Sequence, residues 1–173
     1  MNKRKQAPQR LTRPQRYAII GVTLALTILL VGLIALRVVR RLSDEPLETV
    51  IVPFDRAEST LTQNLYDGEV ILRISGTGQA GGEDYSDAFY LYQQSDGTPY
   101  SPPLLEHFDL EIDGDRAIRT LGLIETPPRY SPDHVYTVHY DVGLTPRPIA
   151  LRISDSVVGD NTGAFQVQIY RAE

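Results

Sequence analysis

The 173-residue sequence contains no cysteine. Disulfide bonds, thiolate metal sites and a cysteine nucleophile are therefore excluded. A domain without disulfides must be held together by packing, and roughly 130 residues can bury an adequate core on their own. Any metal in this protein is expected to bind to oxygen or imidazole ligands.

Acidic residues are missing from the first 41 positions, which carry nine basic side chains. The whole chain has 17 Lys and Arg residues, so residues 42–173 contain eight of them. The same residues contain all 22 acidic residues, which gives them a net charge of −14. Such asymmetry indicates two parts that lie in different surroundings. An acidic domain repels phosphate backbones, so a nucleic-acid partner is not expected, whereas divalent cations are attracted.

Charged residues are also missing from residues 18–36, which read AIIGVTLALTILLVGLIAL. A 19-residue helix is roughly 29 Å long and matches the hydrocarbon core of a bilayer. Six basic residues precede this segment and three follow it, which predicts a cytoplasmic N-terminus. A cleaved signal peptide is the alternative, but its apolar region is normally shorter and ends in a small-residue cleavage site.

The sequence therefore predicts a single-pass membrane protein in four parts. Residues 1–16 form a basic cytoplasmic tail, 17–39 a transmembrane helix that acts as a signal anchor, 40–47 a linker, and 48–173 an extracytoplasmic domain.

No segment after residue 42 shows a helical period of apolar residues, whereas alternation with a period of two recurs. The dipeptide Asp113-Gly114 is a strong signal for a two-residue hairpin. An all-β domain follows, predicted as an antiparallel β-sandwich or jelly roll of about seven or eight strands. The expected strands lie at 49–54, 69–75, 87–93, 109–112, 116–120, 134–141, 148–154 and 164–171.

Motifs for common chemistries are absent or incomplete. Gly76, Gly78 and Gly81 match GxGxxG, but loop and strand follow them where a dinucleotide site needs a helix. His134 and His139 lie five apart on one predicted strand and so point to opposite faces, which argues against zinc. The sequence has neither a GxSxG nor an HExxH motif. Because no carboxylate pair has an apolar setting, we do not expect an enzyme, although a hydrolase that uses such a pair stays open.

The most specific feature is the segment 155–163, DSVVGDNTG, between two good strands. Asp155, Asp160 and Asn161 supply hard side-chain oxygens, and the glycines let backbone carbonyls turn inward. Calcium takes six to eight such oxygens in irregular geometry. The alternative is a polar hairpin loop in which Asp and Asn side chains bind their own backbone.

Residues 149–170, IALRISDSVVGDNTGAFQVQIY, resemble the last strand, metal loop and final strand of the galactophilic bacterial lectin family. Residues 68–80, GEVILRISGTGQA, are similar to that family's early strand and following loop. The resemblance implies a calcium-dependent, galactose-binding β-sandwich in which sugar hydroxyls contact the ion. In this resemblance, Asp155 matches the family's calcium-binding Asp, and Asp160-Asn161 matches its Asn-Asn pair. Gly81 falls near the position in the loop after the early strand whose backbone carbonyl binds the ion. The loop here is two residues shorter than in the family.

These observations predict an anchored extracytoplasmic binding module with Ca²⁺ as its cofactor and a glycan or envelope protein as its partner. The alternative is a structural module of an envelope complex, with no small ligand, whose contacts are made by a tyrosine-rich face containing Tyr85, Tyr90 and Tyr92.

Overall fold

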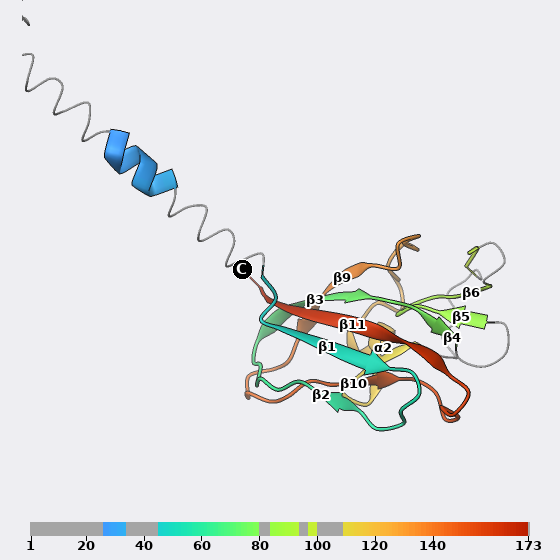
Figure 1. Cartoon of the computed structure of the whole chain (residues 1–173). Helices are drawn as coiled ribbons and strands as arrows, with labels where there is room; N and C mark the ends of the chain where they lie inside the picture. The colour runs from blue at the N-terminus through green and yellow to red at the C-terminus, as the bar shows by residue number, and fades with distance from the viewer. Residues whose placement is uncertain (1–25, 34–44, 80–83, 94–96, 100–108, 173) are drawn as a thin grey trace, which may run out of the picture. The chain divides into compact units, whose positions relative to one another are not determined.

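The computed structural model describes residues 26–33, 45–79, 84–93, 97–99 and 109–172 (Figure 1). The chain divides into two compact units, Met1–Asp44 and Glu45–Glu173. In the first unit, residues 26–33 are helical. Among the described residues there is no helix long and apolar enough to cross a membrane. The predicted transmembrane segment 17–39 lies mostly outside the described residues.

The second unit is built from antiparallel strands, which confirms the predicted all-β class. The described strands are β1 (Glu48–Pro53), β2 (Thr60–Leu61), β3 (Glu69–Ser75), β4 (Gly78–Gln79), β5 (Asp84–Ser86), β6 (Leu91–Gln93), β7 (Leu110–Ile112), β8 (Asp115–Arg116), β9 (Tyr136–Asp141), β10 (Ala150–Ile153) and β11 (Thr162–Arg171). They exceed the predicted number because β2, β4 and β5 have only two or three residues and show no readable alternation.

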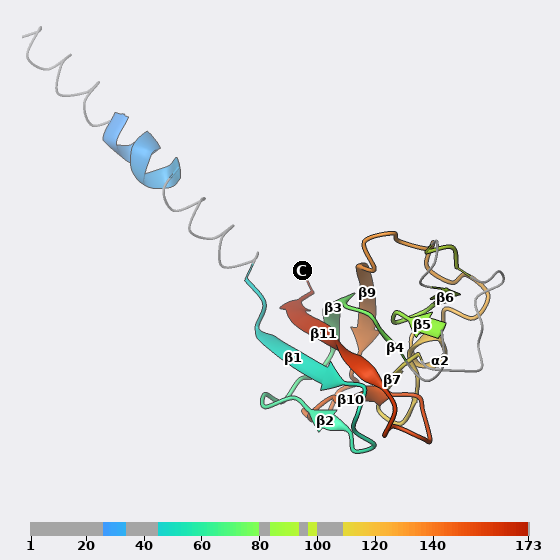
Figure 2. The same cartoon turned by 45° about the vertical axis from the view of Figure 1, so that its right-hand side comes forward.

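The strands form two sheets. The larger has the order β6-β5-β4-β11-β3-β9, with β1 beside β11 as well, and the smaller has the order β2-β10-β7-β8. Figure 2 shows β1, β11 and β3 in succession, with β4, β5 and β6 beyond the start of β11. The long strand β11 therefore organises the larger sheet, since β3 and β4 follow one another along one of its edges and β1 takes the other.

Period-two alternation decides which side chains face the core. In β3, Val70, Leu72 and Ile74 are buried, as the sequence predicts. Apolar residues of both sheets share one hydrophobic cluster, in which the rings of Phe54 and Phe165 meet edge to face at 4.5 Å. Fully burying an aliphatic or aromatic side chain stabilises the fold by roughly 1.5–3 kcal/mol.

The predicted Asp113-Gly114 hairpin is confirmed. It joins β7 to β8 with positive φ at both turn residues, 55° and 87°, as a type I′ turn requires. The Asp113 carboxylate also accepts hydrogen bonds from Arg147 Nη1 at 2.6 Å, from the Tyr140 hydroxyl and from the Ala150 backbone. The turn is thereby fixed to β9 and β10.

Two predicted strands are corrected. The expected strand 116–120 is β8 followed by a single helical turn, α2 (Ala117–Thr120), because Ala117 and Ile118 are both buried in the core and alternation is lost. The expected strand 87–93 is a turn followed by β6, because the Asp87 side chain accepts hydrogen bonds from the backbone of Phe89 and Tyr90 at 2.9 and 2.8 Å. Such side-chain bonds compete with strand pairing.

Candidate functional site

The loop between β10 and β11 folds around the side chain of Asp155. Its Oδ1 accepts a hydrogen bond from the Val157 backbone at 2.9 Å, which closes an Asx turn. Its Oδ2 accepts one from the Asn161 side-chain amide at 2.8 Å. The same amide nitrogen donates to the carbonyl oxygen of Phe54 at 3.2 Å, just beyond β1. Three chain segments therefore meet at Asn161.

Asn161 is only 5% exposed, and its Oδ1 is buried with no hydrogen-bond partner in the described part of the chain. Leaving a buried acceptor unsatisfied costs about 1–3 kcal/mol. Most buried polar atoms in folded proteins have a partner, so an exception indicates a place for an ion or an ordered water.

The structure brings together two of the three predicted calcium ligands. Asp155 and Asn161 are in contact, whereas Asp160 is exposed on the turn before Asn161. Over the described ranges, carboxylate, imidazole and thiolate groups nowhere gather in threes with metal-binding geometry. An ion at this loop would therefore depend on amide and carbonyl oxygens beside Asp155, and calcium accepts both kinds of ligand.

The start of the early loop lies directly beside this site. Gly78 and Gln79 in β4 pair with Gly163 and Thr162 at the start of β11. A Cβ on Gly163, at φ 104°, would lie 2.5 Å from the Gly78 Cα, so only glycine permits this approach. Gly76 and Gly78 of the GxGxxG match therefore serve close packing against β11, and the flexible loop expected of these glycines is not seen at either position. Gly81 itself lies outside the described residues.

A buried carboxylate that sequence reasoning missed organises the region around β6. Asp87 is 0% exposed, and its Oδ2 contacts the Tyr136 hydroxyl at 2.7 Å and His134 Nδ1 at 2.9 Å. Burial, followed by the charge of Asp87, raises the pKa of Tyr136. His134 precedes β9 at φ 53°, a left-handed conformation that few non-glycine residues adopt. As predicted, it does not share a site with His139, which pairs with Glu69 on the exposed surface.

Aromatic rings surround His134. Tyr92 stacks on the imidazole at 4.7 Å with an interplanar angle of 18°, and Tyr85 lies 6.0 Å from Tyr92. Tyr130 contacts both His134 and Tyr90 edge to face. Tyr92 is buried, whereas Tyr85 and Tyr90 are half-buried. The three tyrosines of the predicted partner surface therefore do not form one open face.

Two further carboxylates are buried, one directly before strand β7 and one within it, although the sequence showed no carboxylate pair in an apolar setting. Asp109 and Glu111 lie two residues apart, 5% and 8% exposed, and Glu111 forms an ion pair with Arg152. Asp109 Oδ1 lies 3.7 Å from Arg116 Nε and has no hydrogen bond within the described residues. Burial raises the pKa of Asp109 to about 7, against the opposing charge of Arg116. The alternating DLEI pattern was the available signal, because it puts both acids on one face.

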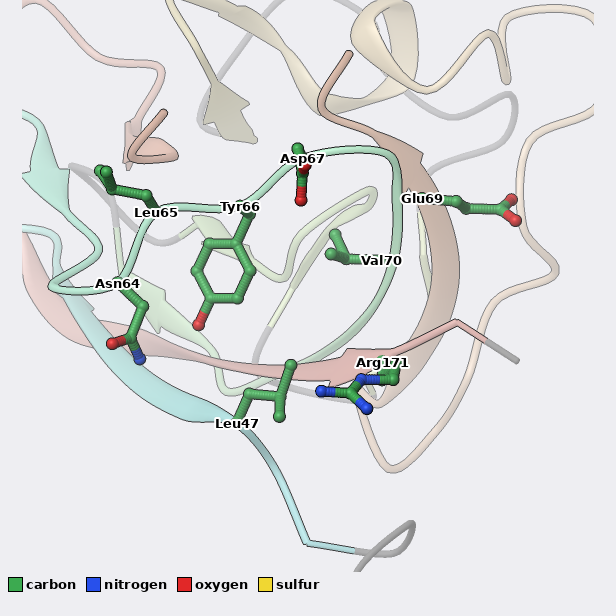
Figure 3. A pocket seen from close by; sticks show the side chains of 8 residues that line it. All are labelled: Leu47, Asn64, Leu65, Tyr66, Asp67, Glu69, Val70 and Arg171. Atoms are coloured by element: carbon green, nitrogen blue, oxygen red, sulfur yellow. The ribbon is translucent and has the colours of Figure 1, made fainter. Parts of the chain in front are cut away.

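A polar pocket of about 410 Å³ opens where β3 begins and β11 ends (Figure 3). Tyr66 forms its wall, and its hydroxyl donates to Glu48 Oε2 at 3.0 Å. Burial raises the pKa of Tyr66 to about 12, so the phenol stays neutral at physiological pH. The pocket can hydrogen-bond a polar molecule. Its other lining residues are Leu47, Asn64, Leu65, Asp67, Glu69, Val70 and Arg171.

Comparison with known proteins gives one structural likeness. No protein-family model matches the chain, and no curated protein matches its sequence. Among solved structures, the chain is similar to one described as "EclA N-terminal domain; PllA-like lectin", with a TM-score of 0.45 and 19% identity. The match covers 75% of this chain and 100% of that chain. Any function proposed for this chain therefore depends on the geometry of its own residues.

Proposed function

We propose that residues 45–173 form a calcium-dependent glycan-binding domain whose ion site is the loop between β10 and β11. The observation that carries the proposal is Asn161, which is buried, contacts Asp155 and has an Oδ1 with no partner among the residues that the structure describes. A purely structural hairpin loop accounts for the Asx turn at Asp155. It does not account for the amide oxygen, because burying that atom without a partner destabilises the loop.

The residues present fit calcium better than other metals. The candidate metal ligands are all oxygen atoms: those of the Asp155 and Asp160 carboxylates, the Asn161 side-chain amide and the Phe54 backbone carbonyl. Hard oxygen ligands of this mixed kind suit calcium, which tolerates irregular geometry, and suit magnesium poorly. Asp155 and Asn161 would contact the ion directly from their observed positions near one another. Asp160, which is exposed, would join them from the adjacent turn.

A bound calcium ion would supply a charged centre to which two neighbouring sugar hydroxyls can coordinate. The ion's remaining ligands would then come from backbone carbonyls, water and the ligand. Galactose is the first candidate, because the resemblance in segment 149–170 points to a galactose-binding family. The proposed role is binding, with no chemical step.

The proposal is tested by melting the full-length protein in EDTA, millimolar calcium and millimolar magnesium, in a detergent without a sugar head group. Calcium at 100 times its Kd should add about 2.7 kcal/mol of stability, and magnesium should add far less. Asp155→Ala and Asp160→Ala should abolish the shift. Glu125→Ala, which removes another exposed carboxylate, should preserve it.

Galactose binding is then measured by titration calorimetry in calcium and in EDTA. Heat of binding that appears only with calcium supports the full proposal. A calcium shift without galactose binding would leave an ion site but no galactose site. Identical melting curves in EDTA and calcium would refute the ion site and leave the hairpin loop as the better account.

We also propose that the apolar segment in residues 17–39 anchors the domain outside the cell, because that segment is uncharged over 19 residues and the flanking charges favour a cytoplasmic N-terminus. The protein should resist carbonate extraction, and proteases added to intact cells should digest residues 45–173. Recovery of a mature chain that starts near residue 40 in the carbonate-soluble fraction would refute the anchor.

A further inference from the structure

The polar pocket beside Tyr66 lies at the opposite end of β11 from the proposed ion site. Arg171, which lines the pocket, is the last residue of β11, and Asn161 directly precedes its first residue, Thr162. At about 3.3 Å per residue, Thr162 and Arg171 lie roughly 30 Å apart along the strand. A ligand in this pocket is therefore separate from any ligand at the ion loop.

Alternation along β11 turns the side chain of Arg171 toward the pocket. Phe165, Val167 and Ile169 are buried in the core, and Arg171 is the next residue on the same face of the strand. Arg171 is also paired in register with Val70, which is buried. Because paired residues of antiparallel strands share a face, the guanidinium lies at the end of the core, where the row of apolar side chains stops.

Two opposite charges line the pocket without meeting one another. Within the described residues, neither the Arg171 guanidinium nor the Asp67 carboxylate has a hydrogen bond or an ion pair. Figure 3 shows their side chains at opposite borders of the pocket, with Tyr66 and Val70 between them. Each charge is therefore available to a molecule that occupies the space between them.

The neighbouring carboxylates are already engaged. Glu48 accepts hydrogen bonds from the backbone N–H groups of residues 63–64 at 2.6 and 3.1 Å and from the Tyr66 hydroxyl at 3.0 Å. Glu69 contacts His139 Nδ1 at 3.1 Å, and its side chain points away from the other labelled side chains in Figure 3. These bonds fix one wall of the pocket before any ligand binds, and such preformed walls are usual in small-molecule sites.

The balance of charge favours a ligand that carries both signs. One guanidinium, that of Arg171, lies near the carboxylates of Glu48, Asp67 and Glu69. A free anion such as phosphate would be attracted by Arg171 but repelled by the carboxylates, and a simple amine would leave the guanidinium without a partner. A zwitterion pairs with both Arg171 and Asp67 and brings no net charge.

The remaining lining suits an aliphatic side chain. Leu47 and Leu65 are 45% and 63% exposed, and both line the pocket together with Val70. Covering exposed apolar surface is favourable in water. The volume of about 410 Å³ lies within the range of roughly 300–1,000 Å³ that is typical of small-molecule pockets. The pocket thus combines a cation, an anion and an apolar wall in a space of suitable size.

We propose that this pocket binds a free α-amino acid with an aliphatic side chain, such as leucine. The planar guanidinium of Arg171 matches the two oxygens of a carboxylate. The Asp67 carboxylate accepts hydrogen bonds from the ammonium group, and the aliphatic side chain packs on Leu47 and Leu65. The inference goes beyond the proposed function, because it needs neither calcium nor a glycan.

The test is titration calorimetry on the full-length protein in a non-ionic detergent, with four ligands. L-Leucine has both charges and the side chain, leucinamide lacks the carboxylate, 4-methylpentanoic acid lacks the ammonium group, and glycine lacks the side chain. Leucine should bind about threefold or more tightly than each of the others, because a single exposed charge pair contributes modestly. Its affinity should be the same in calcium and in EDTA.

Two variants assign each charge of the ligand to its partner. Arg171→Gln should remove the preference for leucine over leucinamide, and Asp67→Asn should remove the preference for leucine over 4-methylpentanoic acid. Each variant should keep the other preference and the melting temperature of the ligand-free protein, because neither side chain has a partner within the described ranges. The controls Arg56→Gln and Asp133→Asn remove exposed charges outside the lining and should bind leucine like wild type.

Several results would overturn the site. They are the absence of leucine binding, equal affinity for the four ligands, unchanged preferences in both variants, and unfolding of both variants, which would give the two charges a structural role. O-Phosphoethanolamine, which carries the charges of a lipid head group, is titrated in parallel, and tighter binding of this compound than of leucine would overturn the amino acid as ligand. The calcium melting curves judge the proposed function separately, so the failure of one proposal is distinguishable from the failure of the other.

Discussion

Replacing Asp109 with Asn should stabilise the domain at neutral pH and have little effect in acid. The carboxylate is 5% exposed and lies 3.7 Å from Arg116 Nε without a hydrogen bond to Oδ1 among the described residues. Burial raises its pKa from 3.8 to about 7, Arg116 opposes the shift and Glu111 adds to it. The folded state therefore holds the Asp109 proton more tightly than the unfolded chain does.

The sign follows from proton linkage. Because the folded pKa is the higher one, the stability contributed by the protonated group is fully present below pH 3.8 and is lost as the pH rises to about 7. A shift of roughly three units at 1.36 kcal/mol per unit gives about 4 kcal/mol as the upper limit of this loss. Asn does not titrate, so Asp109→Asn should remove this pH dependence.

The assay is urea unfolding of wild type and variant between pH 4 and 8, followed by near-UV circular dichroism of the ten tyrosines. The stability difference between Asp109→Asn and wild type should rise by about 3–4 kcal/mol from pH 4 to pH 8. The control Asp115→Asn removes a carboxylate near Asp109 whose side chain is 58% exposed. The difference in unfolding free energy between this variant and wild type should stay nearly constant over the same pH range. A flat difference for Asp109→Asn as well would refute the raised pKa of this buried carboxylate.

Two further predictions test the packing beside the candidate sites. Gly163→Ala should destabilise the domain and abolish the rise in melting temperature on adding calcium, because a Cβ there would lie 2.5 Å from the Gly78 Cα at φ 104°. In the control Gly159→Ala, the new Cβ would meet nothing within 4 Å, so its melting temperature in a calorimeter should match that of wild type. Asp87→Asn should cost about 2 kcal/mol in urea unfolding, because hydrogen bonds to a charged acceptor contribute about 1.5–3 kcal/mol. The amide has one oxygen, so it cannot serve both the backbone of Phe89 and Tyr90 and the side chains of Tyr136 and His134. Unchanged stability would contradict the organising role of Asp87.

The sequence predicted those parts of the domain that depend on local pattern. Strand β3 matches the predicted bounds 69–75, because Val70, Leu72 and Ile74 alternate with polar residues over a full strand length. The Asp113-Gly114 hairpin was equally predictable, since both residues tolerate positive φ. The proximity of Asp155 and Asn161 follows from a short loop between two strands.

Several of the shortest elements were beyond sequence reasoning. Strands β4 and β5 span Gly78–Gln79 and Asp84–Ser86, too short for a period to show, and they form through tertiary pairing, β4 with β11 and β5 with β4. In α2, the burial of Ala117 and Ile118 outweighs any local preference. Tertiary context decides such segments because their own propensities differ by less than 1 kcal/mol per residue.

The sequence by itself determined the division of charge between residues 1–41 and the rest, the all-β class of the second unit and the oxygen-rich loop at Asp155. Only the tertiary structure decided which polar groups lose contact with water. Asp87 meets His134 47 positions away, and Asn161 meets Phe54 107 positions away. Burial of Asp109 and of the Asn161 oxygen likewise depends on the packing of distant strands. Solvent access is a property of the whole fold, and it is what turns an ordinary carboxylate or amide into a candidate site.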